Sequence, residues 1–222
     1  MASNVTYEYI RKNPDVLEYV RRADKVLEAI GYTEHSFAHV EKVSYVSSMI
    51  LKELDYPERT VELARIAGFL HDIGNIINRA DHAHNGAMMA FYLLEKLNMP
   101  ADEICSIISA IGNHDERTAQ PVDPISAALI LADKTDVRRS RVRNTTFISF
   151  DIHDRVNYAV TSSALTVSED KKSFNLELEI DTEISSVLEY FEIFMDRMLL
   201  CKRAAQYFDM SFRIYMNGSI VL

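Results

Sequence analysis

Four segments of this 222-residue chain combine helical periodicity with an ionisable side chain on the apolar face. In the first, His39 precedes Val43, Val46 and Ile50 by four, seven and eleven residues, so all four share one helix face. The other three are His71 (with Leu63 and Ala67), His114 (with Ile107 and Ile111) and Asp133 (with Ile125 and Leu129). Burying an imidazole or a carboxylate is costly unless it is paired or bound, so these helices need a shared partner for their polar groups.

A divalent metal ion is a partner that would satisfy all four helices at once. Asp72, next to His71, adds a second carboxylate. Neutral imidazoles and carboxylates are ligands for Zn, Fe, Mn, Co and Ni, and the interior of a helical bundle is where such ligands assemble. One histidine on an apolar face is more often an ordinary core residue, but four helices with the same arrangement favour a metal site.

The sequence pattern predicts helices in the first two thirds of the chain and both strands and helix in the remainder. Apolar residues recur at helical spacing up to about residue 145, in segments 36–56, 57–75, 83–97, 101–114 and 124–140. Ser36 is expected to cap the first of these helices. Two strands at 156–167 and 174–181, a long amphipathic helix at 183–208 and a final strand or hairpin turning at Asn217-Gly218 follow.

Composition and charge exclude several classes of protein. The net charge of −9 gives no general electrostatic footprint for nucleic acid, so a nucleic-acid partner is not expected. The N-terminal residues contain no apolar signal region, and no apolar run reaches the ~20 residues of a membrane span. Cys105 and Cys201 match no paired metal or redox spacing. We therefore expect a cytoplasmic protein with reduced cysteines and no membrane partner.

The ordered set His39, His71-Asp72 and Asp133 resembles the H…HD…D signature of the HD-domain metal-dependent phosphohydrolases. The sequence HVEKV is similar to the family's H-x-x-R-V opening, and AGFLHDIGN is similar to its apolar-LHDIGK segment. The resemblance covers roughly residues 30–140. It implies an HD-type helical metal-binding domain, which we place at 1–145. With the small C-terminal α+β (β-β-α-β) subdomain that the residue pattern predicts at 146–222, the expected fold is mainly α.

Two further histidines extend the resemblance to the family's two-metal members. His82 precedes Gly86-Ala87 by four residues, as in an H-x-x-x-G-A element, and His114 ends the following helix. The complete set is similar to the six ligands of HD-type diadenosine tetraphosphate hydrolases: His39, His71, Asp72, His82, His114 and Asp133. This implies two divalent transition metals (Fe, Mn, Co, Ni or Zn, with Mg as a further candidate) bridged by Asp72.

Two other histidines are candidates for the surroundings of the site. His84 is an alternative to His82 because it also stands at the start of a helix. We prefer His82 for its spacing to Gly86, which would leave His84 beside the metal ligands or facing the substrate. His35 precedes the first ligand and is expected to line the site.

The resemblance implies hydrolysis of a phosphate ester or anhydride of a nucleotide or another small phosphorylated metabolite. Two metals lower the pKa of a bridging water and clamp the phosphoryl oxygens during in-line attack. We expect Asp72, Lys134 and Arg138 to be catalytic, and a basic cluster after the last ligand to hold the substrate's phosphates: Lys134, Arg138, Arg139, Arg141 and Arg143. The alternative, left open here, is a solvated helix end whose basic residues complement the helix dipole.

One residue departs from the family pattern. Asn75 stands where the family usually has a lysine that serves the substrate phosphate. Arg79 and Lys134 are the candidates to replace it. Neither a GYP sequence nor a KH-like GXXG segment is present, which argues against a cyclic di-GMP phosphodiesterase and against an RNase of the HD type.

Two other functions remain compatible with these residues. Some HD-fold proteins use the same six ligands as a diiron oxygenase, although the arginine cluster favours phosphate. A non-catalytic metal-binding regulatory module is the second alternative, which the complete ligand set disfavours. The alternating strand and the long helix of the C-terminal region could pair with a second copy, so we expect a homodimer.

Overall fold

The computed structural model describes residues 5–143 and 151–221 and contains two compact units, Met1–Asp133 and Lys134–Leu222. The domain boundary expected between residues 145 and 146 lies outside the described residues. The fold is mainly α with a small C-terminal α+β region, as the sequence predicts. No helix within the described residues is long and apolar enough to cross a membrane.

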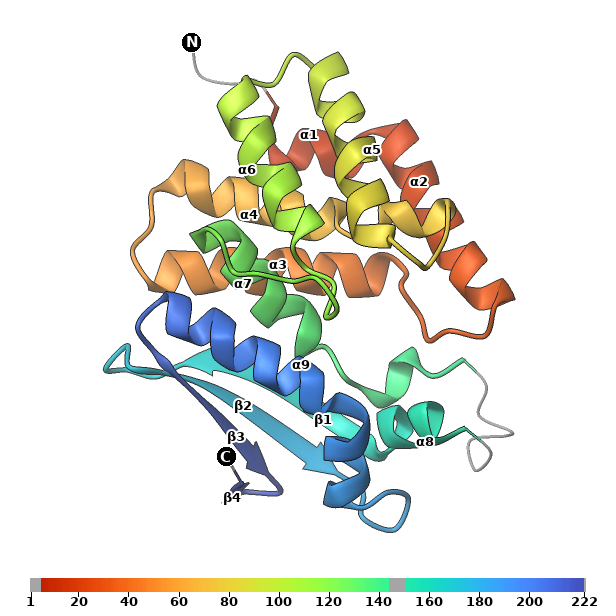
Figure 1. Ribbon diagram of the computed structural model, residues 1–222, viewed down its shortest axis with the longest axis vertical. Helices are drawn as coiled ribbons and strands as arrows, with labels where there is room; N and C mark the ends of the chain where they lie inside the picture. The colour runs from red at the N-terminus through yellow and green to blue at the C-terminus, as the bar shows by residue number, and fades with distance from the viewer. Residues whose placement is uncertain (1–4, 144–150, 222) are drawn as a thin grey trace. The chain divides into compact units, whose positions relative to one another are not determined.

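Within the described residues, every regular element of the first unit is a helix (Figure 1). In chain order these are α1 Tyr7–Lys12, α2 Pro14–Ala29, α3 Phe37–Glu53, α4 Glu58–Leu70, the 3₁₀ helix η1 Ile73–Ile76, α5 His82–Lys96, α6 Ala101–Gly112 and α7 Pro124–Lys134. The helix expected at 83–97 is α5, shifted by one residue. Ser36 caps α3 as predicted, accepting a hydrogen bond from the backbone N–H of Ala38 at 3.2 Å.

Helices α3 and α4 form a closely packed hairpin. Ser44 and Ser47 of α3 are buried, and their hydroxyls donate to backbone carbonyls of α4 at 2.8 and 3.1 Å. A Cβ atom at Gly68 would lie only 2.8 Å from Cα of Ser44, so only glycine permits this approach. The hairpin brings His39, near the start of α3, to the same end as His71, which follows α4.

The second unit contains a four-stranded sheet crossed by one long helix (Figure 1). It contains η2 Arg139–Arg141, α8 Ile152–Ala159, β1 Val160–Val167, β2 Ser173–Ile180, α9 Val187–Tyr207, β3 Ser211–Met216 and β4 Ser219–Ile220. The strand order is β1-β2-β3-β4. The β2–β3 pair is parallel and the other two pairs are antiparallel, so α9 is the crossover between parallel strands.

The predicted alternation of β2 is confirmed. Phe174, Leu176, Leu178 and Ile180 are buried, while the two glutamates between the last three are exposed. The turn at Asn217-Gly218 has φ values of 49° and 75° and joins β3 to β4. The β-β-α-β order expected for the C-terminal region is therefore present, with β4 added as a short hairpin partner.

Two element boundaries differ from the sequence prediction. The strand expected from Val156 begins only at Val160, because Asp151 caps α8 by accepting hydrogen bonds from two backbone N–H groups. The helix expected at 124–140 ends at Lys134. There, the carbonyl of Thr135 accepts hydrogen bonds from the backbone of Val137 and the hydroxyl of Ser163, which replaces the next helical bonds.

Candidate metal centre

The six predicted ligand residues lie together inside the first unit. They come from separate elements: His39 from α3, His71 from the end of α4, Asp72 from the start of η1, His82 from the start of α5, His114 from the residues after α6 and Asp133 from α7. The four histidines and Asp72 are buried. Their donor atoms form three overlapping groups, and within each group the atoms lie within 4.8 Å of one another. The groups are His39, His71 and Asp72; His71, His114 and Asp133; and Asp72, His82 and His114.

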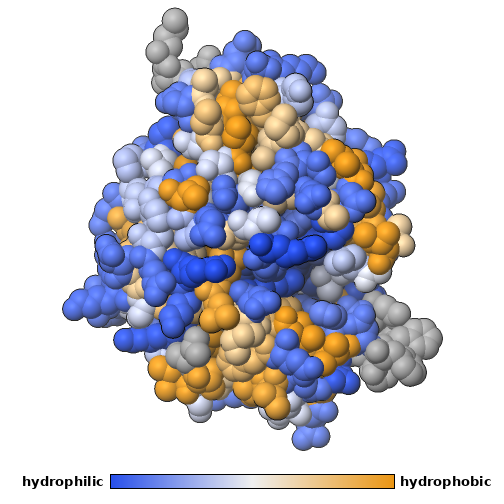
Figure 2. Space-filling view, in the orientation of Figure 1, coloured by the Kyte–Doolittle hydropathy of each residue, from blue (hydrophilic) through white to orange (hydrophobic). Residues whose placement is uncertain are grey.

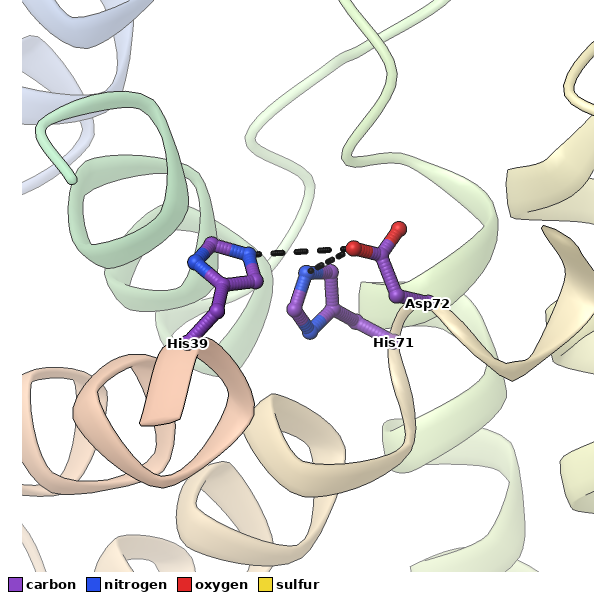
Figure 3. Close-up of side chains that lie close together, drawn as sticks. All are labelled: His39, His71 and Asp72. Atoms are coloured by element: carbon purple, nitrogen blue, oxygen red, sulfur yellow. Dashed lines mark ion pairs between the residues drawn. The ribbon is translucent and has the colours of Figure 1, made fainter. Parts of the chain in front are cut away.

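One oxygen of Asp72 faces the first histidine pair. Oδ2 of Asp72 lies 3.3 Å from Nε2 of His71 and 3.7 Å from Nε2 of His39 (Figure 3). Oδ1 of Asp133 lies 3.4 Å from Nε2 of His39 and 3.7 Å from Nε2 of His71. Two imidazoles and two carboxylates thus converge, which is a donor set suited to a divalent transition metal.

The other oxygen of Asp72 faces the second histidine pair. Oδ1 of Asp72 lies 3.7 Å from Nε2 of His82, and Nε2 of His82 lies 3.2 Å from Nε2 of His114. Asp72 therefore belongs to both donor groups and presents a different oxygen to each.

Backbone carbonyls determine which nitrogen of each ring faces the cluster. Three Nδ1 atoms lie near the carbonyl oxygen three residues earlier: His71 to Gly68 at 2.8 Å, His82 to Arg79 at 3.1 Å and His114 to Ile111 at 2.6 Å. Since a carbonyl only accepts, each Nδ1 carries the proton, and Nε2 of the neutral ring presents a lone pair.

These tautomers make the cluster suited to a cation. The lone pairs of His82 and His114 face each other at 3.2 Å, which is unfavourable unless a proton or a metal is shared between them. Nε2 of His71 is buried without an aligned hydrogen-bond partner, although two carboxylates lie nearby. Both features are resolved when the nitrogens donate to a divalent metal, so the residues present fit such an ion.

The electrostatics of these side chains support the same conclusion. Burial alone would lower the pKa of His71, but Asp72 and Asp133 outweigh burial and raise that pKa to about 10. Burial would raise the pKa of Asp72, yet His71 and His35 hold it well below its usual range. A proton on His71 therefore balances the carboxylates at neutral pH, and a metal would replace that proton.

Asn75 holds the shared carboxylate in place. Its Nδ2 donates to Oδ1 of Asp72 at 2.8 Å and to the Asp72 carbonyl at 2.9 Å, and the side chain is fully buried. Nearby, a Cβ atom at Gly74 would overlap the backbone of His82 and Gly86. Glycine at this position therefore permits the close contact of η1 with α5 that brings His82 beside Asp72.

Arg79 and His35 also lie at the cluster. Nη1 of Arg79 lies 3.3 Å from Oδ1 of Asn75 and 3.9 Å from Oδ1 of Asp72, and its guanidinium lies 5.5 Å from the ring centroid of Tyr32. Nε2 of His35 lies 4.0 Å from Oδ2 of Asp72. The Arg79 side chain is 18% exposed, so it combines a contact with the buried carboxylate and access to solvent.

His84 lies apart from the donor groups. Its side chain is exposed, and it lines a small cavity of about 70 Å³ together with Asp115 and Arg117. His82 and His84 were alternative candidates for the same metal ligand, and the structure places His82 in the cluster.

Three of the basic residues after Asp133 have hydrogen-bond partners inside the second unit. Arg138 donates to Asp136 at 2.9 Å and to Ser140 at 2.6 Å. Arg141 is buried and donates to the carbonyl of Asp136, and Arg139 donates to the carbonyl of Tyr158 at 2.6 Å. Lys134 is buried at the end of α7, and Arg143 is partly exposed. These contacts give Arg139 and Arg141 a role in holding the α+β region together.

Sequence reasoning missed two residues of the site's surroundings. Asn75 stands out only as a departure from a family pattern, although its position three residues after Asp72 is the signal for a contact within one turn. Tyr32 lies in the turn region between α2 and α3, where no periodic pattern marks it.

Comparison with known proteins finds a family match for part of the chain. The family model described as HD domain matches residues 36–138, a span that contains all six clustered residues. Among solved structures, a predicted HD superfamily hydrolase from an uncultured Thermotogales bacterium is 27% identical, covers 56% of this chain and 67% of its own, and gives a TM-score of 0.45. No curated protein matches the sequence. Residues 36–138 of this chain thus match the HD domain family.

Proposed function

We propose that this chain is a metal-dependent phosphohydrolase that holds two divalent metal ions and cleaves a phosphate ester or anhydride of a nucleotide or another small phosphorylated metabolite. The observation that carries the proposal is the position of Asp72, whose two oxygens face two different histidine pairs. A single shared carboxylate between two imidazole-rich donor groups is suited to a binuclear centre rather than to one ion.

Each side chain then has a distinct task. His39, His71 and Asp133 would hold one ion with Oδ2 of Asp72, and His82 and His114 would hold the other with Oδ1. When bound, such ions lower the pKa of a coordinated water and stabilise the charge that develops on the phosphoryl group. Asn75 keeps the shared carboxylate in the rotation that serves both ions.

Arg79 is the cation that we assign to the substrate's phosphate. A guanidinium can donate two parallel hydrogen bonds to a phosphate, and stacking over Tyr32 limits the motion of Arg79. Asn75 accepts from Arg79 while it donates to Asp72, so the residue found in place of a lysine positions another cation. His35 and His84 are further candidates to face the substrate. Lys134 and Arg138 are proposed to assist catalysis by holding the substrate's phosphates.

The test is a screen of nucleotides and small phosphorylated metabolites for phosphate release, with metal-free protein reloaded with Mn, Co, Ni, Fe, Zn or Mg. We expect turnover that requires added metal and falls at least 100-fold in Asp72→Asn, as on the order of several kcal/mol of charge stabilisation is lost. Asp102→Ala removes an exposed carboxylate of α6 and is the matched control. Oxygen consumption in place of phosphate release would instead support the oxygenase alternative.

A further inference from the structure

The outer face of α9 carries a regularly spaced stripe of side chains that is exposed. The helix packs on β2 and β3 and buries the opposite face, which contains Tyr190, Phe194, Met198, Cys201 and Ala205. The outer stripe consists of Leu188, Glu192, Met195, Leu199, Lys202 and Gln206. Its apolar members are well exposed: 77% for Leu188, 42% for Met195 and 48% for Leu199. Figure 2 shows hydrophobic side chains at the surface where Figure 1 places α9.

The spacing of the stripe is that of a helix–helix seam. Its members are separated in turn by four, three, four, three and four residues, the order in which the a and d positions of a heptad follow one another. A helix face that meets only water needs no large apolar side chains at these positions, yet Leu188, Met195 and Leu199 occupy three of them. Large apolar side chains gathered on one exposed face mark a surface that another protein covers.

The charges on the stripe indicate which partner covers it. Glu192 lies in the N-terminal half of the stripe and Lys202 in the C-terminal half, equally far from Arg197 at the centre. In an antiparallel pair of identical helices related by a twofold axis at this centre, Glu192 of each copy meets Lys202 of the other, and Met195 meets Leu199. A parallel pair would instead place like charges opposite each other, which is unfavourable.

We propose that a second copy of this chain covers the outer face of α9, so that two α9 helices pack antiparallel in an isologous dimer. The pairing forms two central layers of Met195 against Leu199. Two Glu192–Lys202 layers flank them, and Leu188 meets Gln206 at each end. This dimer is independent of the metal centre, since it rests on α9 alone.

Charge reversal tests the dimer and its register. Light scattering and sedimentation should give a dimer for the natural chain, and Glu192→Lys or Lys202→Glu should weaken it at least tenfold, because each places like charges in two layers. The double variant Glu192→Lys/Lys202→Glu should restore dimerisation. Glu169→Lys, an exposed residue of the β1–β2 turn, makes the same charge change away from the stripe and should leave the dimer intact.

A cysteine pair gives a second, structural readout. In a Cys105→Ser background, which removes the exposed native thiol, Met195→Cys/Leu199→Cys should form a covalent dimer on mild oxidation. A chain that is monomeric up to hundreds of micromolar would overturn the proposal and would indicate that another part of the same chain covers α9. A dimer unaffected by Glu192→Lys, or a double variant that stays dissociated, would overturn it as well. Circular dichroism of each variant establishes that it is folded.

Discussion

The decisive residue of this protein is Asp72, because the structure holds its carboxylate from several directions at once. One oxygen faces His39 and His71, and the other faces His82 and accepts from Asn75. A carboxylate that serves two donor groups cannot rotate without losing both. Residues that fix this rotation are therefore as important to metal binding as the ligands themselves.

Asn75→Ala should weaken metal binding by roughly 10- to 100-fold without unfolding the chain, because the substitution removes both hydrogen bonds from Asn75 to Asp72. Competition with a chelator measures this affinity. Asn78→Ala is the matched control, since Asn78 is exposed and accepts only from the backbone of Ala80 in the same loop. Equal affinities in the two variants would contradict a positioning role for Asn75.

Comparing His82→Ala with His84→Ala tests which of the two histidines binds metal. His82 lies in the cluster and His84 is exposed, so His82→Ala should lower the metal content by about one ion per chain, whereas His84→Ala should leave it unchanged. Elemental analysis of the dialysed proteins measures the content. Loss of metal in His84→Ala alone would reverse the assignment.

Metal binding should release a proton, because His71 has a raised pKa. At pH 7 the metal-free side chain is protonated, since its pKa of about 10 lies well above that pH. Nε2 must lose this proton to donate to a metal, so affinity should rise about tenfold per pH unit between pH 6 and 8. Calorimetry in two buffers of different ionisation enthalpy counts the protons. A pH-independent affinity would contradict this account.

At the residue scale, helical spacing predicted four of the six clustered side chains: His39, His71, His114 and Asp133. Asp72 was added because it is next to His71, and His82 came from the resemblance to a family element. These four lie on apolar faces, and a buried polar group must meet a partner. The same argument could not reveal what Asn75 does, because its contacts depend on the tight 3₁₀ turn of η1. Helical spacing also could not show that Arg139 and Arg141 donate hydrogen bonds to carbonyls of the second unit. The partner of Arg139, Tyr158, is distant in sequence, and the bond from Arg141 to Asp136 depends on a local turn.

At the scale of elements, the α3–α4 hairpin determines where His39 and His71 meet. Its small interface residues, Ser44, Ser47 and Gly68, permit the close approach of the two backbones. An added methyl group at Gly68 would press against the backbone of α3, so this interface tolerates little change in volume.

Gly68→Ala should lower the free energy of unfolding by about 1–3 kcal/mol, because its Cβ would lie too close to the backbone of Ser44. Urea denaturation measures the change. Gly112→Ala is the matched control: its Cβ would meet only Cβ of Ala87 at 3.8 Å, an ordinary contact, so this variant should be neutral or slightly stabilising. Equal destabilisation of both would contradict the packing argument.

Element types were easier to predict than their ends. The period of two in β2 and the period of 3.6 in the long helices are repeated often enough to identify each type. The ends of α7 and the start of β1 depend on single contacts, namely the bonds to the Thr135 carbonyl and the cap at Asp151. Such contacts come from residues brought together by the fold, so the local pattern does not contain them.

At the scale of the whole molecule, the chain combines a helical region, of which residues 36–138 match the HD domain model, with a C-terminal α+β region. The matched region contains all six residues proposed to hold the metals, while the α+β region contains the α9 surface proposed to meet a second copy. The two roles are separable by mutation: Asp72→Asn should leave dimerisation unchanged, and Glu192→Lys should leave the metal content unchanged.

The central claim is that Asp72 joins two metal ions into one hydrolytic centre, and the most direct measurement is the metal content of the natural chain and of Asp72→Asn. We expect two ions per chain, with phosphate release that follows metal loading, and expect Asp72→Asn to lose at least one ion together with its turnover. Two ions retained in Asp72→Asn with undiminished phosphate release would contradict the account.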